Sequence, residues 1–432
     1  MKNIGERISA AREEVRMTQA ELAEKMDTTQ SAIARMESGK QNISTAMLRK
    51  VGVALGRNLM GDAAGSVNLS VTGARTLSGT IETNTSKNGA VGLLCASLLN
   101  KGTTTLHHVP QIEEVFRLIE VLESIGVKTT WNERTLTITP PSTFNLHSID
   151  EVAARKTRSI VMFIGSLMHR LDSFSLPQSG GCKLGSRTVR PHFYALEKFG
   201  IHIDTTENAY EVSVAKTTPK EVILYESGDT VTENALFAAA CTADTTVIKY
   251  ASANYMVQEI CHFLELCGVK IEGIGTTTLT VHGIAQIHTD IEYTLAEDPI
   301  DAMFFLATAI VTGSEMTIAR CPIEFLELEM LTLEKMGLIY TKSDVYLSHN
   351  ERTKLVDITV KKSVLHAPPE KIHARPYPGL NADNLPFFAI IAATAEGQTL
   401  IHDWMYEKRA IYFTELDKLG AETALADPHR IY

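Results

Sequence analysis

Apolar and polar positions alternate at helical spacing through residues 1–60, a stretch without proline. Two apolar faces are predicted, one with Ile8, Ala11 and Val15 and the next with Leu22, Ala23 and Met26. The pattern predicts several short helices that each bury one side.

Capping residues predict where these helices begin and end. Thr18-Gln-Ala-Glu21 is a capping box, in which the Thr hydroxyl and the Glu carboxylate satisfy each other's free backbone donors, so we expect a helix to begin at Gln19. Asp27-Thr-Thr29 interrupts this helix, and Thr29 then caps a second helix over residues 30–38, which Gly39 closes. Two short helices joined by a tight turn predict a helix-turn-helix.

Residues 57–66 lose the apolar periodicity and gather glycine and small side chains, which predicts a linker. Beyond it the pattern L-[ED]-x-x-G occurs five times, ending at Gly126, Gly200, Gly268, Gly337 and Gly420. Each copy follows a small-residue apolar helix and a short β-branched strand, and its glycine is expected to end a second helix in the left-handed conformation. The repeats predict an α/β body of βαβαββ units, arranged as two similar globules with a cleft between them.

Composition and charge narrow the classes of protein. With 44% apolar and 21% charged residues, the 432-residue chain can bury several cores, which excludes disorder. No apolar window is long enough to span a membrane and the N-terminus is charged, so a cytoplasmic location is expected. Six cysteines without a CxxC pair argue against a disulfide framework and a zinc site.

Residues 1–60 contain ten Lys and Arg against seven Asp and Glu, whereas the whole chain has a net charge of −10. A basic head on an acidic body is typical of a DNA-reading module fused to a second protein, because cations are needed only where phosphates are contacted.

The segment TQAELAEKMDTTQSAIARMESGK resembles the Cro/repressor-type helix-turn-helix family. The resemblance implies that Gln30, Ser31 and Arg35 meet base edges in the major groove of double-stranded DNA. Since such heads usually read paired half-sites, a homodimer is expected. The alternative is a small helical bundle used for protein contacts.

Four segments of the body resemble the enolpyruvyl transferases, within them the UDP-N-acetylglucosamine 1-carboxyvinyltransferases. They are Ser86-Lys-Asn-Gly-Ala, Lys156-Thr-Arg158, Gly180-Gly-Cys-Lys-Leu-Gly-Ser-Arg187 and Tyr377-Pro-Gly-Leu-Asn-Ala-Asp383. The resemblance implies an α+β inverse-barrel fold and three domains: a helix-turn-helix domain over residues 1–64, a globule of residues 65–86 plus 296–432, and a globule of residues 87–295 that carries the cysteine loop.

This family moves an enolpyruvyl group from phosphoenolpyruvate to the 3-hydroxyl of UDP-N-acetylglucosamine, a step in peptidoglycan precursor synthesis that uses no metal or cofactor. By resemblance, Cys182 is the proton donor, and the cations Lys183 and Arg187 beside it would lower the pKa of its thiol. The alternative for a cysteine is an inert buried side chain, the reading favoured for Cys95, Cys241 and Cys261.

Asp383 matches the family's acidic residue near the sugar hydroxyl, as a general base or an orienting acceptor; the alternative is a helix N-cap, and both can hold. The matched substrate-binding residues are Lys87, Arg158 and Arg187 for phosphate and carboxylate, Asn88 for the sugar, and Arg409 as a further arginine of the cleft. Lys87 is also counted among the catalytic residues.

Two globules of three units need six repeats, and the sequence shows five, with no counterpart of the family's last unit. A shortened product, a partner chain that supplies the unit and a body reduced to binding all fit this pattern. Arg190 also stands where the family has an Asp near the nucleotide. The main hypothesis is therefore a transferase fused to a DNA-binding domain, and the alternative is a transcription regulator whose body senses a ligand without turnover.

Overall fold

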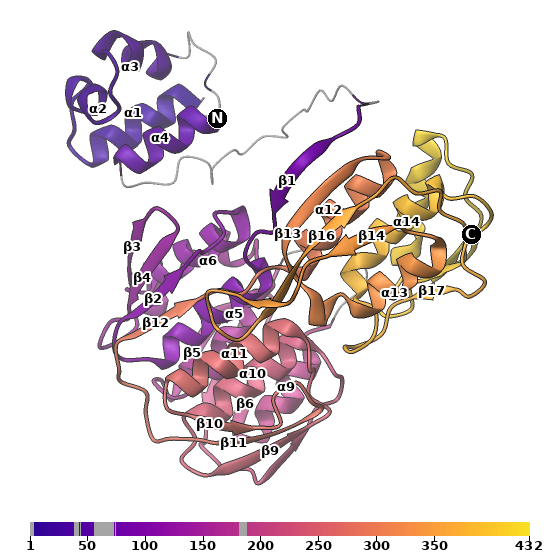
Figure 1. The fold of residues 1–432 in the computed structure, drawn as a ribbon. Helices are drawn as coiled ribbons and strands as arrows, with labels where there is room; N and C mark the ends of the chain where they lie inside the picture. The colour runs from indigo at the N-terminus through magenta and orange to yellow at the C-terminus, as the bar shows by residue number, and fades with distance from the viewer. Residues whose placement is uncertain (1–3, 39–42, 44, 56–72, 74, 181–187) are drawn as a thin grey trace.

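A computed structural model describes residues 4–38, 43, 45–55, 73, 75–180 and 188–432 (Figure 1). None of the helices in these ranges has the length and apolar character that a membrane span requires.

The described residues of the head form four helices: α1 (Ile4–Glu14), α2 (Gln19–Lys25), α3 (Gln30–Glu37) and α4 (Thr45–Leu55). The predicted start of α2 is confirmed, with both hydrogen bonds of the Thr18–Glu21 capping box in place. Thr29 caps α3, which ends one residue before the predicted end, and Gly39 lies outside the described residues. The prediction for Val15 is wrong, because α1 ends at Glu14 and Val15 is 36% exposed.

The head has a core of its own. Its buried members come from all four helices: Ile8, Leu22, Ala23, Ile33, Met36, Leu48, Val51 and Leu55. Arg12 and Glu37 form an ion pair of 2.6 Å between α1 and α3, and both side chains are nearly buried. The packing holds α2 against α3, the two helices that the sequence predicts as a helix-turn-helix.

The body repeats the order helix, strand, helix, strand, strand five times. The first copy is α5 (Lys87–Ala96), β2 (Thr104–His107), α6 (Glu113–Ser124), β3 (Lys128–Asn132) and β4 (Thr135–Thr139). The second is α8 (Phe163–Leu167), β5 (Ser173–Pro177), α9 (Arg190–Glu197), β6 (Ile201–Thr205) and β7 (Ala209–Val214). The third is α10 (Asp229–Ala240), β9 (Thr245–Lys249), α11 (Tyr255–Leu266), β10 (Lys270–Glu272) and β11 (Thr278–His282).

The fourth copy is α12 (Pro299–Val311), β13 (Glu315–Pro322), α13 (Glu327–Met336), β14 (Tyr340–Lys342) and β16 (Lys354–Val360), with β15 (Tyr346–Leu347) paired to β16. The fifth is α14 (Leu385–Thr394), β18 (Ile401–His402), the 3-10 helix η6 (Arg409–Leu419), β19 (Leu425–Asp427) and β20 (Arg430–Ile431). Short helices join them: η1 (Ser97–Leu99), η2 (Leu146–Ser148), α7 (Glu151–Ala154), η3 (Ser159–Met162), η4 (Ile323–Phe325) and η5 (Ala382–Asn384).

The glycine that ends each L-[ED]-x-x-G motif has a positive φ, between 80° and 104°, as predicted for a left-handed cap. This conformation strains any residue with a Cβ, which explains why glycine recurs at all five positions.

Each copy contributes one sheet, in the orders β12-β2-β4-β3, β5-β7-β6, β10-β11-β9-β8, β1-β13-β16-β14 and β17-β18-β20-β19. The added parallel strands are β1 (Ser78–Glu82), β8 (Glu221–Ile223), β12 (Ile291–Thr294) and β17 (Ile372–His373). Strand β1 pairs with β13 from the fourth copy, whereas β12 returns to β2 in the first. The chain therefore crosses between the two globules twice, near residues 83–86 and 295–298.

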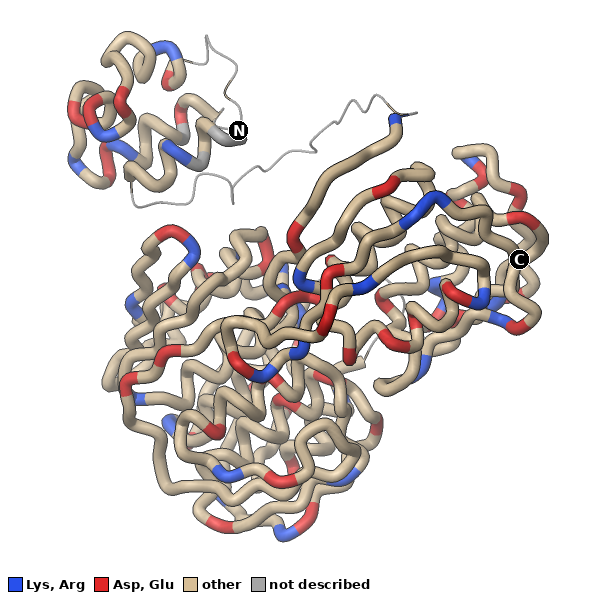
Figure 2. The backbone as a smooth tube through the Cα atoms, in the orientation of Figure 1, with Lys and Arg blue, Asp and Glu red and all other residues tan. Residues whose placement is uncertain are grey.

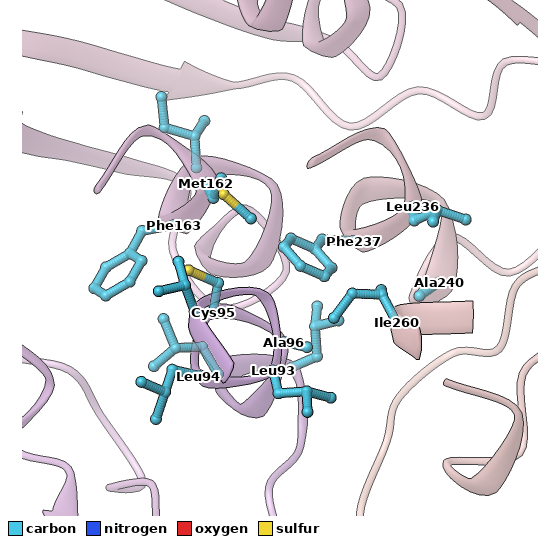
Figure 3. Packing of buried hydrophobic residues seen from close by; sticks show 14 of the residues in the cluster. Leu93, Leu94, Cys95, Ala96, Met162, Phe163, Leu236, Phe237, Ala240 and Ile260 are labelled. Carbon is cyan, nitrogen blue, oxygen red and sulfur yellow. The ribbon is translucent and has the colours of Figure 1, made fainter. Parts of the chain in front are cut away.

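Two separate hydrophobic cores fill the body. One runs from Ala90 to Leu295 and the other from Ala302 to Ile431. In the first core nearly all residues of α5, α8 and α10 are buried, and Figure 3 shows Cys95, Phe163 and Phe237 among the apolar side chains that these helices pack together. The small residues of α5 permit this close approach, since a Cβ on Gly92 would lie 3.0 Å from Ile260. Close packing of α5 against α11 thereby fixes the position of the first turn of α5.

Candidate active site

Lys87 and Asn88 occupy the first turn of α5, where the positive end of the helix dipole favours anions. The hydroxyl of Ser86 caps the helix by accepting from the N–H of Gly89 at 2.9 Å. Asn88 donates through Nδ2 to the hydroxyl of Tyr255 at 3.1 Å, and Tyr255 is buried. The predicted contact residues are thus held by a rigid helix and by α11.

A pocket of about 540 Å³ opens beside this turn. Its lining residues are Lys87, Asn88, Glu113, Glu114, Arg117, Lys156, Arg158, Ser159, Val161, Met162 and Thr230. The ammonium of Lys87 pairs with Glu114 at 2.6 Å. Glu114 also accepts from the hydroxyls of Thr157 at 3.3 Å and Ser159 at 3.4 Å, on either side of Arg158. One carboxylate of α6 therefore ties together the two predicted phosphate-binding segments.

Arg158 also lines a second pocket, of about 420 Å³, that lies between the two globules. Asp383 lines it from the opposite globule, together with Arg375, Trp404 and Tyr406. The Asp383 side chain is 46% exposed and lies in η5, where its N–H donates to Asn381. Because Asn384 is the N-cap of α14, the N-cap alternative for Asp383 is wrong.

Asp298 joins the first turns of two helices from different globules. It caps α12 by accepting from the N–H of Ile300 at 2.8 Å, and its other oxygen accepts from the N–H of Lys87 at 3.2 Å. Burial raises the pKa of Asp298 to about 6, although both hydrogen bonds oppose the shift. The carboxyl group sits at the crossover, next to a predicted substrate contact.

Arg409 is buried rather than open to the cleft, with a side chain 7% exposed. It forms an ion pair with Asp403, donates to the carbonyl of Ala382 at 2.6 Å and lies 3.5 Å from Asp383. Its guanidinium also lies over the ring of Tyr406, at 4.4 Å from the centroid. Arg409 therefore contacts both the backbone and the carboxylate of the segment that carries Asp383.

Cys182, Lys183 and Arg187 lie outside the described residues. Among the described cysteines, Cys95 and Cys261 are buried, and burial raises the pKa of both thiols well above the ordinary value. Cys241 is half-buried, and burial raises the pKa of its thiol to about 11. None of these three thiols is poised to ionise, in line with the inert reading.

The exposed face of α3 presents the residues predicted to meet DNA. Gln30, Ser31 and Arg35 are all exposed, whereas Ala32, Ile33 and Met36 are buried. Gln30 donates through Nε2 to Oε1 of Gln19 at 2.8 Å. Figure 2 shows Lys and Arg positions interspersed with Asp and Glu positions along the described backbone of the head.

Comparison with known families identifies relatives of both the body and the head. Residues 71–430 match the family described as EPSP synthase (3-phosphoshikimate 1-carboxyvinyltransferase). The chain belongs to this family of enolpyruvyl transferases. Residues 8–60 match the helix-turn-helix family, so the head is a helix-turn-helix domain.

Two curated relatives are UDP-N-acetylglucosamine 1-carboxyvinyltransferases. The protein from Bradyrhizobium diazoefficiens is 31% identical over 362 residues, which cover 83% of this chain and 82% of the relative. The protein from Treponema denticola is 29% identical over 361 residues, which cover 83% of each chain.

Two solved structures share the fold. The enolpyruvyl transferase NikO from Streptomyces tendae superposes with a TM-score of 0.69 at 20% identity, over 83% of this chain and 82% of that one. EPSP synthase from Acinetobacter baumannii gives a TM-score of 0.61 at 18% identity, over 82% of this chain and 81% of that one.

Sequence reasoning missed Glu114, Asp298 and Tyr255 as partners of the predicted site residues. Glu114 lies in the run Glu113-Glu114, which is indistinguishable from an ordinary acidic first turn of a helix. Asp298 before Pro299 carries a helix-capping signal, but its bond to Lys87 depends on how the globules meet.

Proposed function

We propose that the body transfers the enolpyruvyl group of phosphoenolpyruvate to the 3-hydroxyl of UDP-N-acetylglucosamine. The observation that carries the proposal is the position of Arg158, which lines both the cation-rich pocket beside Lys87 and the cleft pocket that contains Asp383. Phosphoenolpyruvate would occupy the first pocket and the sugar nucleotide the second. The names of the curated relatives support the same pair of substrates.

In this reaction the sugar oxygen adds to C2 of phosphoenolpyruvate while C3 receives a proton, and the adduct then loses a C3 proton and inorganic phosphate. Asp383 would accept the hydroxyl proton, and the Cys182 thiol would supply the proton to C3. Lys87, Arg158 and Arg187 would hold the phosphate and carboxylate, while Asn88 would contact the sugar. Arg190 stands where the family has an acidic residue near the nucleotide. We therefore expect the acceptor site to differ most from that of the family at its nucleotide end.

Phosphate release by the purified full chain, given both substrates, tests this function. We expect release that needs both substrates and that Cys182→Ala abolishes. Release that Cys182→Ala leaves unchanged would remove the thiol from the mechanism. The second candidate function is a regulator that senses these ligands, and the helix-turn-helix head is the observation that favours it. A folded protein that binds both substrates without releasing phosphate would support this second function.

We further propose that the head reads double-stranded DNA through Gln30, Ser31 and Arg35, and that the chain acts in the cytoplasm as a homodimer on paired half-sites. Exposure of these three side chains on α3 supports the DNA contact. Selection of bound sequences from a random DNA pool, with Arg35→Ala as the variant, tests it. The mass of the protein in solution tests the dimer, and a monomer would refute it.

The division into residues 1–64, 65–86 plus 296–432, and 87–295 is also a proposal. Three separate hydrophobic cores and two crossovers near residues 83–86 and 295–298 support it. Limited proteolysis that yields stable fragments at these boundaries is the expected result.

A further inference from the structure

Basic side chains and imidazoles gather on the outer face of the fifth sheet, formed by β17, β18, β20 and β19. His373, His402 and Arg430 lie directly opposite one another on three neighbouring strands. Their neighbours along these strands include buried isoleucines, so the three side chains face away from the core. Neither the sequence motifs nor the proposed reaction uses this row.

Two further cations reach the row from either end of β17. Arg375 donates through Nε to Nε2 of His373 at 2.7 Å, and the ammonium of Lys371 lies 3.2 Å from Nδ1 of His402. Because a lysine ammonium can only donate, the imidazole nitrogen of His402 is the acceptor. A guanidinium and an ammonium thus converge on two imidazoles that are themselves neighbours.

The acceptors of these two cations are unusual. An exposed lysine elsewhere in the same globule, Lys354, pairs with the carboxylate of Glu324 at 2.9 Å. In the part of the chain that the structure describes, neither Lys371 nor Arg375 forms an ion pair with a carboxylate. Hydrogen bonds to an ionised acceptor are about twice as strong as those to a neutral one. Both cations would therefore gain by exchanging an imidazole for an anion.

The charges around the two imidazoles disfavour their protonation. Burial and the charges of Arg375 and Lys371 lower the pKa of His373, although the carbonyl of Lys371 opposes the shift. Burial and the neighbouring Lys371, Arg430 and His373 lower the pKa of His402, and Asp427, which pairs with Arg430, opposes that shift. An anion among these groups would remove the repulsion and favour the protonated rings.

We propose that this outer cluster binds a compact tetrahedral dianion, such as the phosphate group of a phosphomonoester, and takes up protons as it binds. The cluster consists of Lys371, His373, Arg375 and His402. Its donors converge on two adjacent positions and do not form a long row, which suits one compact anion better than the backbone of a polymer. Arg375 provides a planar fork and Lys371 a point charge, while the protonated rings donate two further hydrogen bonds.

The outer cluster borders the cleft, because Arg375 also lines the pocket that contains Asp383. The inference rests on the contacts among the four side chains and not on the proposed transfer reaction. It adds a second place where a phosphate-bearing ligand can bind to the body, separate from the first turn of α5.

Calorimetric titration of the full chain with sulfate tests the cluster. Sulfate is a tetrahedral dianion that does not titrate near neutral pH, so every proton taken up belongs to the protein. Titrations in two buffers of different ionisation enthalpy give the number of these protons. We expect uptake of about one proton per sulfate at about pH 6.5, and binding at least about threefold tighter at pH 6 than at pH 8.

Substitutions assign the binding to the cluster. Lys371→Met and Arg375→Met each remove one exposed cation, so the fold should be retained and the affinity for sulfate should fall about threefold. Replacing both His373 and His402 with Asn keeps an acceptor for each cation but removes the titrating groups. This double variant should bind sulfate with no proton uptake and with little dependence on pH.

Two controls match these variants within the same globule. Lys354→Met removes an exposed lysine that already has a carboxylate partner, and His366→Asn removes an exposed histidine that lies 3.3 Å from Glu396. Both should leave sulfate affinity and proton uptake unchanged. Sulfate bound at the first turn of α5 would persist in every variant and so cannot imitate the expected losses.

Sulfate affinity that neither Lys371→Met nor Arg375→Met lowers would overturn the site. Proton uptake that persists in the double histidine variant would overturn its coupling to the imidazoles. If the two cation variants instead lose binding to duplex DNA of random sequence and keep their sulfate affinity, the face is a polymer surface and the compact site is refuted. None of these measurements uses phosphate release, so a failure of the transfer reaction appears in a separate assay.

Discussion

Arg409→Met separates two roles for this arginine, a substrate contact and a support for Asp383. In the structure its guanidinium pairs with Asp403, whose side chain is fully buried, and donates to Ala382. Removing it would leave the Asp403 carboxylate buried without its counter-charge. Burial already raises the pKa of Asp403 against the effect of Arg409, so the substitution should raise that pKa further.

The expected cost is that of breaking a buried ion pair from one side, about 3–5 kcal/mol. In a globule of this size such a loss lowers the melting temperature by roughly 10 °C. Adding Asp403→Asn to Arg409→Met should restore much of it, because the orphaned charge is then gone. Arg430→Met is the control in the same globule, since its pair with Asp427 is exposed and its loss should leave the melting temperature nearly unchanged.

Calorimetry of the four proteins gives the melting temperatures, and phosphate release gives kcat and KM. A support for Asp383 predicts a lower kcat with a nearly unchanged KM for phosphoenolpyruvate, because the displaced group belongs to the acceptor side of the cleft. The reasoning is refuted if Arg409→Met melts like the starting protein and only raises KM. That result would return Arg409 to direct contact with substrate.

Two further predictions concern pH and the head. Burial lowers the pKa of His169 to about 4, below the value of about 6.5 in the unfolded chain. The neutral imidazole therefore contributes its full stability above pH 6.5. As the pH falls toward 4, the free energy of unfolding should decrease by about 3 kcal/mol. His169→Gln keeps the donor to the carbonyl of Phe237 and should flatten urea midpoints measured across this range, whereas exposed His202→Gln should not; equal slopes would contradict this. A Cβ on Gly5 would lie 2.3 Å from the carbonyl oxygen of Glu37, so Gly5→Ala should disrupt the packing of α1 on α3. We expect the variant to lose DNA binding by the full chain and to keep its phosphate release. Intact DNA binding would refute this packing.

Features set by local chemistry could be predicted from the sequence. The capping box fixes the start of α2, and all five L-[ED]-x-x-G glycines adopt the left-handed conformation because short-range backbone sterics demand it. Val15 shows a limit of prediction from periodicity within one helix. The apolar pattern continues to Val15, but helix α1 ends at Glu14 and the Val15 side chain is exposed. Glu114 shows the limit between elements, because its pairing with Lys87 depends on how α6 packs against α5.

Arg158 and Arg409 show why residue type and motif position do not settle a role. The same resemblance marks both as substrate-binding arginines, yet Arg158 is half-buried and lines two pockets, while Arg409 is buried among Asp403, Asp383 and Tyr406. A guanidinium that neutralises a buried carboxylate cannot turn to a ligand without leaving that charge unpaired, at a cost of several kcal/mol. Arg158, by contrast, is half-buried and donates to the carbonyl of Thr188 at 2.7 Å. Burial of the counter-charge, which no sequence motif records, therefore leads us to predict a supporting role for Arg409 and a binding role for Arg158.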